Sequence, residues 1–183
     1  MIYRYIKIFD LFGLTGLFFL SCNNNYYSLK YLPVNFLTHN YNDSIVKLEY
    51  LTGSNFFKNQ TQSHLIYYWV SNDSIYKTQG NFSGKLLHGN YMIFYPSGQL
   101  KTKGCFHFGL KDGEWMYWNI YGTLQKTENW KAGLKDGETK IYNVEGRLIS
   151  VTNFKEGLKH GWAINYDNTE IREKIRFKKG IEK

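Results

Sequence analysis

The chain has 183 residues, enough for one ordinary domain, and it carries a formal net charge of +8 with 19% aromatic residues. After residue 25 no stretch shows a sustained apolar period of about 3.6 residues, which argues against a mainly helical protein. Abundant Tyr, Phe, Trp and Thr together with 17 glycines favours strands joined by tight turns, so we expect an all-β fold.

Residues 1–21 have the features of an export signal. Positive residues precede an apolar run over 11–20, which is too short to cross a bilayer comfortably but suits the hydrophobic segment of a signal peptide. The run ends at Ser21-Cys22, which resembles a bacterial lipoprotein signal, in which the cysteine is lipidated and becomes the new N-terminus. We therefore expect a signal helix, a lipid on Cys22, and a lipid-anchored protein of the bacterial cell envelope, at the outer membrane or facing the periplasm. A plain secretion signal or an uncleaved membrane anchor is the alternative.

Two less regular segments follow the signal. Residues 22–40 are rich in Asn, Tyr, Leu and Ser, and we expect them to form a tether between the lipid and the folded part. Residues 41–80 have an irregular strand-like pattern in which Asn-Asp-Ser-Ile, a turn sequence, occurs twice. We expect this segment to supply one or two degenerate repeats that begin a repeat array, because terminal repeats are often atypical. With Cys22 lipidated, Cys105 would remain as a free thiol.

Residues 81–183 are organised by a repeat of 24 residues. The phrase Gly-Leu-Lys-Asp-Gly occurs at 109–113 and 133–137, Gly-Leu-Lys-His-Gly occurs at 157–161, and a looser copy covers 84–89. Another glycine follows nine residues after each of the first three closing glycines. A fixed period of this size is the signature of stacked repeats. The repeat-defining glycines are Gly89, Gly98, Gly113, Gly122, Gly137, Gly146 and Gly161.

Each unit is predicted to hold a strand of about six residues, a turn, a second strand of about eight, and the Gly-Leu-Lys-Asp-Gly phrase as a link. The turn is clearest at Tyr95-Pro96-Ser97-Gly98, where Pro fixes φ and Gly accepts a positive φ, as in a hairpin with a bulge. The corresponding turn at 167–170 lacks the glycine, which predicts a shorter terminal hairpin. We expect successive hairpins to bury each other's aromatic rows without a thick core.

The repeats resemble the MORN-repeat family, in the bacterial variant common in YwqK-type antitoxin components. The resemblance covers about residues 65–183, with Thr139 and Ala163 standing where Trp is usual and His88 and His160 where Asp is usual. It implies an elongated, twisted antiparallel sheet of stacked hairpins and a scaffold for proteins or membranes. The best-matching unit carries Gly109, Asp112, Gly113, Trp115, Tyr117, Trp118, Gly122, Leu124 and Trp130.

The sequence contains few groups arranged for catalysis or metal binding. Asp112, Asp136, His88 and His160 recur at equivalent positions, but ligands placed one hairpin apart in a row do not converge on a metal. We expect these side chains to hold turns by hydrogen bonds to the backbone. Because the sequence also lacks a Gly-x-Ser-x-Gly motif, a phosphate loop and a Cys/His pairing, we expect no catalytic residues, no metal, no cofactor and no enzymatic activity.

The expected function is therefore that of a non-catalytic scaffold, anchored to the membrane by its lipid, that binds an unidentified protein partner. One alternative is that the aromatic rows and the lysines bind a glycan or an anionic lipid. A second is antitoxin-like binding of a toxic partner, which requires a cytoplasmic form. We expect no nucleic-acid partner, because the chain has an export signal and its lysines alternate with acidic residues. The candidate binding residues are Tyr91, Trp115, Tyr117, Trp118, Tyr142 and Tyr166.

Overall fold

The computed structural model describes residues 34–41, 43–53 and 60–183, and within them the chain is all-β. Its 13 strands form an open antiparallel sheet of hairpins, and no α-helix occurs in these ranges. The signal helix, the lipidated Cys22 and the first part of the tether expected from the sequence lie outside the described residues. No helix in the described ranges is long and apolar enough to cross a bilayer.

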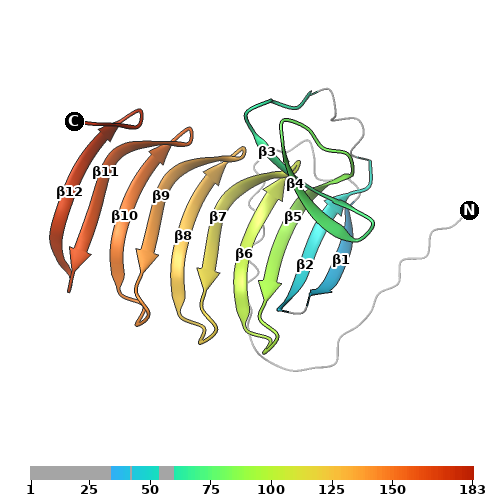
Figure 1. Ribbon diagram of the computed structural model, residues 1–183, viewed down its shortest axis with the longest axis horizontal. Coiled ribbons are helices and arrows are strands. Elements are labelled where there is room, and N and C mark those ends of the chain that lie inside the picture. The colour runs from blue at the N-terminus through green and yellow to red at the C-terminus, as the bar shows by residue number, and fades with distance from the viewer. Residues whose placement is uncertain (1–33, 42, 54–59) are drawn as a thin grey trace, which may run out of the picture.

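The main path of the sheet runs β1-β2-β5 and then in chain order from β6 to β13 (Figure 1). The β3–β4 hairpin leaves this path and pairs only through β3 with the start of β5, so it lies across the end of the sheet that holds β1, β2 and β5. The strands are β1 (Val34–Tyr41), β2 (Ser44–Leu51), β3 (Ile66–Ser71), β4 (Ser74–Gln79), β5 (Lys85–Phe94), β6 (Leu100–His107), β7 (Leu110–Trp118), β8 (Leu124–Lys131), β9 (Leu134–Tyr142), β10 (Leu148–Lys155), β11 (Leu158–Asp167), β12 (Glu170–Lys178) and β13 (Ile181–Glu182).

The N-terminal part differs from the sequence prediction in two respects. The first strand begins at Val34, inside the expected tether 22–40, because β1 pairs with β2 along its whole length and this pairing satisfies its backbone groups. The two Asn-Asp-Ser hairpins also pack differently. The β1–β2 hairpin forms the first two strands of the main sheet path, whereas the β3–β4 hairpin lies off that path and adds no strand to it. The reason is that β3 is apolar on both faces, with Tyr67 and Trp69 buried in one cluster and Val70 in another. If β3 were a strand of a single exposed layer, the apolar side chains on one of its two faces would be exposed to water.

From β5 onward two kinds of turn alternate. One kind has four residues: at Tyr95–Gly98, Gly98 N donates to Tyr95 O over 2.9 Å and Gly98 has φ +87°. This is the bulged hairpin predicted from Pro96 and Gly98. The other kind has two residues with positive φ, as at Phe108 (+48°) and Gly109 (+77°), the conformation of a type I′ turn. The 167–170 hairpin is shortened to such a two-residue turn at Asn168 and Thr169, as predicted.

The Gly-Leu-Lys-Asp-Gly phrase is a turn followed by a strand, which corrects its prediction as a link. Gly109 is the second turn residue, and 110–113 already belong to β7, which therefore has nine residues where about six were expected. A register shift between the pairs of Lys103 and Cys105 accommodates Gly113 at φ +68° inside the strand, so the backbone need not leave the sheet. All seven repeat-defining glycines have positive φ: Gly89, Gly98, Gly113, Gly122, Gly137, Gly146 and Gly161.

Neighbouring two-residue turns are hydrogen-bonded to one another. Gly133 N donates to Lys111 O over 2.9 Å, and Gly157 N donates to Lys135 O over 2.8 Å. The same bond joins Gly180 N to Lys159 O over 2.8 Å. The turn tips therefore form one connected row along an edge of the sheet.

In three of the four phrases the acidic or imidazole residue holds the next turn, as the sequence predicted. Asp112 Oδ1 accepts a hydrogen bond from Ala132 N over 3.0 Å, and Asp136 Oδ2 accepts one from Glu156 N over 3.2 Å. His88 Nδ1 accepts the equivalent bond from Phe108 N over 3.3 Å. Asp and His can replace each other at this position because the turn requires a single acceptor.

The core lies where the β3–β4 hairpin covers the sheet. One buried cluster joins Val70 of β3 to Leu48, Leu87, Phe106 and Trp115 of the sheet. A second cluster joins side chains of β3 to the first turn tips, with these members: Leu51, Leu65, Tyr67, Trp69, Phe82 and Leu86. The molecule is therefore thicker at its N-terminal end than a single layer of hairpins.

Candidate binding surface

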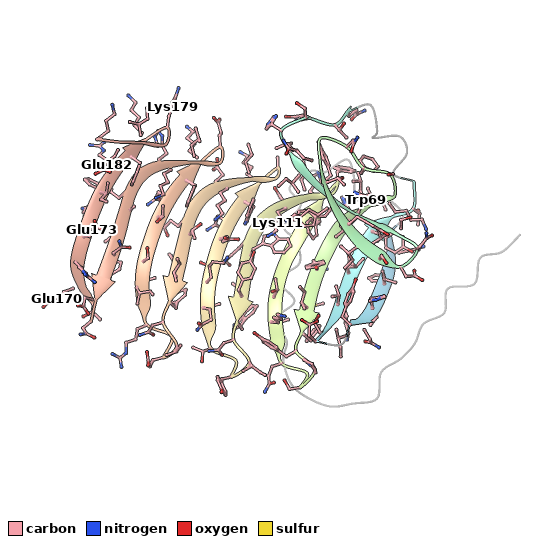
Figure 2. All side chains as sticks on the ribbon, viewed as in Figure 1. Trp69, Lys111, Glu170, Glu173, Lys179 and Glu182 are labelled. Carbon is pink, nitrogen blue, oxygen red and sulfur yellow. The ribbon has the colours of Figure 1, made fainter. Side chains whose placement is uncertain are left out.

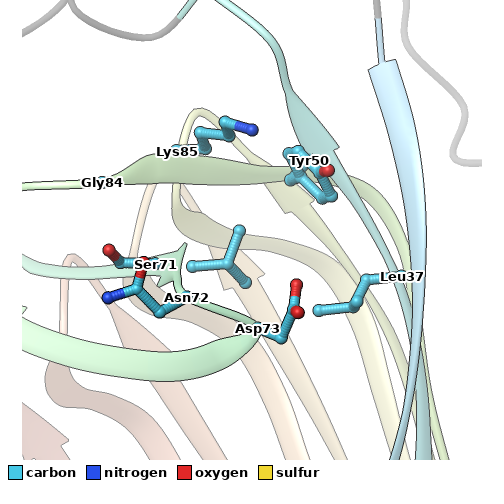
Figure 3. A pocket seen from close by; sticks show the side chains of 8 residues that line it. Leu37, Tyr50, Ser71, Asn72, Asp73, Gly84 and Lys85 are labelled. Carbon is cyan, nitrogen blue, oxygen red and sulfur yellow. The ribbon is translucent and has the colours of Figure 1, made fainter.

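The described residues contain no group of three His, Cys, Asp or Glu side chains placed to hold a metal ion. One hollow of about 230 Å³ lies between the β3–β4 turn and β1–β2 (Figure 3). Asp73 and Lys85 are its charged residues, and the Lys85 ammonium lies 5.1 Å from the centre of the Tyr50 ring. The hollow is smaller than the pockets that usually hold drug-sized ligands. Its lining is Leu37, Tyr50, Val70, Ser71, Asn72, Asp73, Gly84 and Lys85.

The densest group of polar contacts surrounds Glu128, in the middle of β8. Only 5% of this residue is exposed, although it carries a carboxylate. Its Oε1 accepts contacts from Lys126 Nζ at 3.1 Å and Lys135 Nζ at 3.0 Å. Its Oε2 accepts hydrogen bonds from the Tyr117 hydroxyl at 2.8 Å and from Trp130 Nε1 at 3.2 Å. Glu128 is therefore fully paired, as a buried carboxylate must be.

Lys111 lies beside this carboxylate in a cage of aromatic rings. Its ammonium is 4.1 Å from the centre of the Trp115 ring and 4.8 Å from that of the Trp130 ring, and it donates to the Tyr117 hydroxyl over 3.1 Å. Such cation–π contacts stabilise an ammonium that is partly removed from water. Figure 2 shows Lys111 on the face of the sheet that the β3–β4 hairpin, marked by Trp69, partly covers.

The charges of this group act on one another. Burial alone would raise the pKa of Glu128, but hydrogen bonds from Lys135 and Tyr117 and the charges of Lys126 and Lys135 lower that pKa to about 2. Burial lowers the pKa of Lys111 to about 8, an effect that Glu128 opposes and that the neighbouring lysines reinforce. Burial, and then the charge of Glu128, raise the pKa of Tyr117. At neutral pH the carboxylate is ionised, and it balances the lysines around it.

The same pairing of lysine and aromatic ring continues along the sheet. Lys135 pairs with Trp130 across β8–β9, and its ammonium lies 5.1 Å from the centre of the Phe154 ring in β10. Lys159 pairs with Phe154, and its ammonium lies 4.8 Å from the centre of the Phe177 ring in β12. Every second strand thus repeats one contact. We call this set the lysine–aromatic row: Phe106, Lys111, Trp130, Lys135, Phe154, Lys159 and Phe177.

The structure divides the six aromatic residues that the sequence singled out. Tyr91, Trp115 and Tyr117 gather in the core cluster under β3, and Trp115 is only 2% exposed, so it supports the surface from below and does not form it. Trp115 is buried because its ring lies over Gly104, which has no side chain. The other three are half-buried near the ends of their strands, each opposite a leucine or isoleucine: Trp118, Tyr142 and Tyr166.

Sequence reasoning missed the Glu128 group. Lys111 and Lys135 were visible as the constant lysine of Gly-Leu-Lys-Asp-Gly, and Trp130 was visible as the aromatic residue before the next phrase. The contact between Lys135 and Trp130 depends on the pairing of these two residues across β8 and β9. That pairing follows from the start of β9 at Leu134, earlier than the sequence predicted. The useful signal was Glu128 itself, an acidic residue in the inward series of a strand.

Cys105 is disulfide-bonded, which corrects the expectation of a free thiol. That expectation assumed that the other cysteine of the chain was consumed by a lipid.

No protein-family model, curated protein or solved structure matches the chain.

Proposed function

We propose that the chain is a non-catalytic repeat scaffold of the MORN type, anchored in the bacterial cell envelope by a lipid on Cys22, and that it binds a protein partner on its sheet. One observation carries this proposal: the lysine–aromatic row continues along strands that no described segment overlies, from β8 to β12 (Figure 1). On these strands Lys159 is exposed, and Trp162 in the same strand is 40% exposed. A long sheet with rows of charged and aromatic side chains suits an extended partner better than a small substrate.

The repeat spacing supports the MORN-type assignment. β7, β9 and β11 begin at Leu110, Leu134 and Leu158, and each begins directly after the glycine of a two-residue turn. Each of these leucines lies beside the turn glycine of the next hairpin: a Cβ atom added at Gly133, for example, would lie 3.0 Å from Leu110. The 24-residue unit is thus one hairpin that packs on the next, which is how stacked repeats share their stability.

The lipid anchor is tested by metabolic labelling of the full chain with a palmitate analogue. We expect labelling of the unaltered chain and of Cys105→Ser, and none of Cys22→Ala. The Cys105→Ser variant is the informative control, because it leaves Cys22 as the one cysteine of the sequence that can carry the label. Equal labelling of Cys22→Ala would show that the label is elsewhere. No labelling of any form would remove the anchor and favour the cytoplasmic, antitoxin-like alternative.

The partner is tested by capture from envelope extracts, with variants of the row as the specificity control. Lys135→Glu with Lys159→Glu reverses two charges of the lysine–aromatic row, whereas Arg147→Glu with Arg172→Glu reverses two exposed charges at the opposite strand ends. We expect one protein to be captured by the unaltered chain and by the arginine variant but not by the lysine variant. Saturable binding of a glycan or of anionic liposomes, with no such protein, would favour the alternative function.

A further inference from the structure

The two ends of the strands carry different charge. On the side of the two-residue turns, the segments 131–136, 155–160 and 178–183 hold seven lysines and three acidic residues, a net charge of +4. The three turn segments at the opposite strand ends, 119–124, 143–148 and 167–172, hold two arginines and three acidic residues, a net charge of −1. Figure 2 shows this difference, with Lys179 at one end of the strands and Glu170 at the other. We call the positive side, made of the first three segments, the turn edge.

The lysines of the turn edge are regularly spaced on a connected backbone. Lys131, Lys155 and Lys178 are the last residues of β8, β10 and β12, so they occupy the same position in successive tips. Successive tips are two strands apart, which is about 10 Å. The bonds from Gly157 N to Lys135 O and from Gly180 N to Lys159 O fix each tip to the one before it. The edge is thus a straight row of charges held at a constant interval.

The charges lie on both sides of a ridge that is one sheet thick. Lys131 pairs with Leu134, whereas Lys135 pairs with Trp130, so the two lysines of one tip leave opposite faces of the sheet. Lys131, Lys155, Lys178 and Lys179 are all exposed, and within the described residues none of the four forms an ion pair. An elongated ligand along the ridge would therefore meet lysines from both faces.

The β3–β4 hairpin covers the first of these turn tips, and the tip lysines start at the next one. At the tip between β6 and β7, Tyr68 N of β3 donates to Gly109 O over 2.8 Å, so the β3–β4 hairpin covers that tip. The residues there are His107 and Phe108, at the positions that Lys131 and Ala132 occupy in the next tip. The charged row therefore coincides with the uncovered part of the edge.

We propose that the turn edge binds a linear acidic polysaccharide with about one anionic group per disaccharide, at a site that is centred on Lys131, Lys155 and Lys178 and borders the protein-binding row. Two extended pyranose units span a length similar to the interval of about 10 Å between tips. Nucleic acid fits less well, because a duplex strand places phosphates about every 3.4 Å along its axis. A flat membrane would meet only the outermost side chains of the ridge.

The test is binding of the full chain to hyaluronan, a polymer with one carboxylate per disaccharide, measured by calorimetry at low salt. We expect saturable binding that weakens as salt is added, with a hexasaccharide, which spans three tips, binding far more tightly than a disaccharide. Lys131→Gln with Lys155→Gln and Lys178→Gln should weaken binding about tenfold or more, equivalent to about 1.4 kcal/mol. The matched control Lys103→Gln with Arg147→Gln and Arg172→Gln removes the same charge elsewhere and should change affinity less than about twofold.

Four results would overturn the inference. The first is an absence of hyaluronan binding, and the second is an equal loss of affinity in both triple variants, which would show attraction by net charge alone. The third is tighter binding to single-stranded DNA or to vesicles containing phosphatidylglycerol than to hyaluronan. The fourth is equal affinity for the disaccharide and the hexasaccharide. Because the edge variants leave Lys135 and Lys159 intact, capture of a protein partner by the row is measured independently.

Discussion

The hydroxyl of Tyr117 donates a hydrogen bond to Glu128 Oε2 over 2.8 Å, across the β7–β8 pair. The other oxygen of this carboxylate contacts Lys126 and Lys135, which come from β8 and β9. One buried acidic side chain therefore joins three consecutive strands. Glu128 lies at the boundary between the part of the sheet that the β3–β4 hairpin covers and the part that is a single layer. Its contacts should therefore contribute more to the free energy of unfolding than an ordinary surface ion pair does.

Replacing Glu128 by Gln should destabilise the protein by about 2–3 kcal/mol, because it leaves a buried site and its partly buried lysines without their counter-charge. The measurement is urea unfolding at pH 7, compared with the unaltered chain. Glu138→Gln is the matched control, since Glu138 also contacts a lysine, at 3.0 Å, but is 45% exposed in its side chain. That variant should lose less than about 0.5 kcal/mol. Equal losses in the two variants would contradict the role assigned to burial.

The stability of the fold should fall in acid because of the same residue. The pKa of Glu128 is about 2 in the folded protein and about 4.5 in the unfolded chain. A carboxyl whose folded pKa is depressed contributes stability above the unfolded pKa and loses it as pH falls through the folded pKa. The contribution of Glu128, at most about 3 kcal/mol, should therefore be complete above pH 4.5 and disappear between pH 4.5 and 2. The free energy of unfolding should change more steeply with pH across this range for the unaltered chain than for Glu128→Gln.

His88 should produce a second loss of stability on acidification, in a higher pH range than that of Glu128. Burial, reinforced by the nearby His107, lowers the pKa of His88 to about 4, below the ordinary value of 6.5. Its Nδ1 must stay unprotonated to accept the hydrogen bond from Phe108 N. The unfolded chain thus binds a proton more readily, so stability should be highest above pH 6.5 and decline between pH 6.5 and 4.

The variant that isolates this effect is His88→Asn, whose amide oxygen can accept the same hydrogen bond without titrating. It should remove most of the pH dependence between 6.5 and 4 and keep most of the stability at pH 7. His88→Ala also removes the titration but leaves Phe108 N without its acceptor, and it should cost about 1–3 kcal/mol at pH 7. An unchanged pH profile in His88→Asn would assign the decline to another group, such as His107, whose pKa burial also lowers.

Much of the hairpin array was predictable from the sequence because local rules determine it. Pro96 and Gly98 specify a bulged turn, and the structure has both the turn hydrogen bond from Gly98 N to Tyr95 O and the positive φ of Gly98. Asp112 was expected to hold a turn and does, although the turn lies in the next hairpin. The start of β7 was misplaced, because a positive-φ glycine such as Gly113 can lie inside a bulged strand as well as in a loop.

The cover over the sheet and the group around Glu128 were not predictable by the same rules. The β3–β4 hairpin carries the same turn sequence as β1–β2, so the turn does not distinguish the hairpin that joins the sheet from the one that crosses it. The difference arises from burial of Trp69 and Val70 in two clusters at once, which is a tertiary effect. Trp115 was likewise expected on the surface, because the space above Gly104 is visible only once the strands are in register.

The contact between Trp115 and Gly104 yields the last prediction. A Cβ atom added at Gly104 would lie 2.2 Å from the Trp115 ring, and Gly104 is buried, so the ring would have to move. The ring has little room, because it packs edge-on against Phe106 at 4.9 Å and its Nε1 donates to Cys105 O over 3.2 Å.

Gly104→Ala should therefore cost about 1–3 kcal/mol, the usual range for overpacking a core, and should change the near-ultraviolet circular dichroism of the tryptophans. Gly53→Ala is the matched control, because an added Cβ there meets nothing within 4 Å, and it should stay within about 0.5 kcal/mol of the unaltered chain. Equal urea midpoints for the two variants would mean that the Trp115 ring can leave Gly104 freely. In that case Trp115 could be exposed in solution, and it would return to the set of surface residues available to a partner.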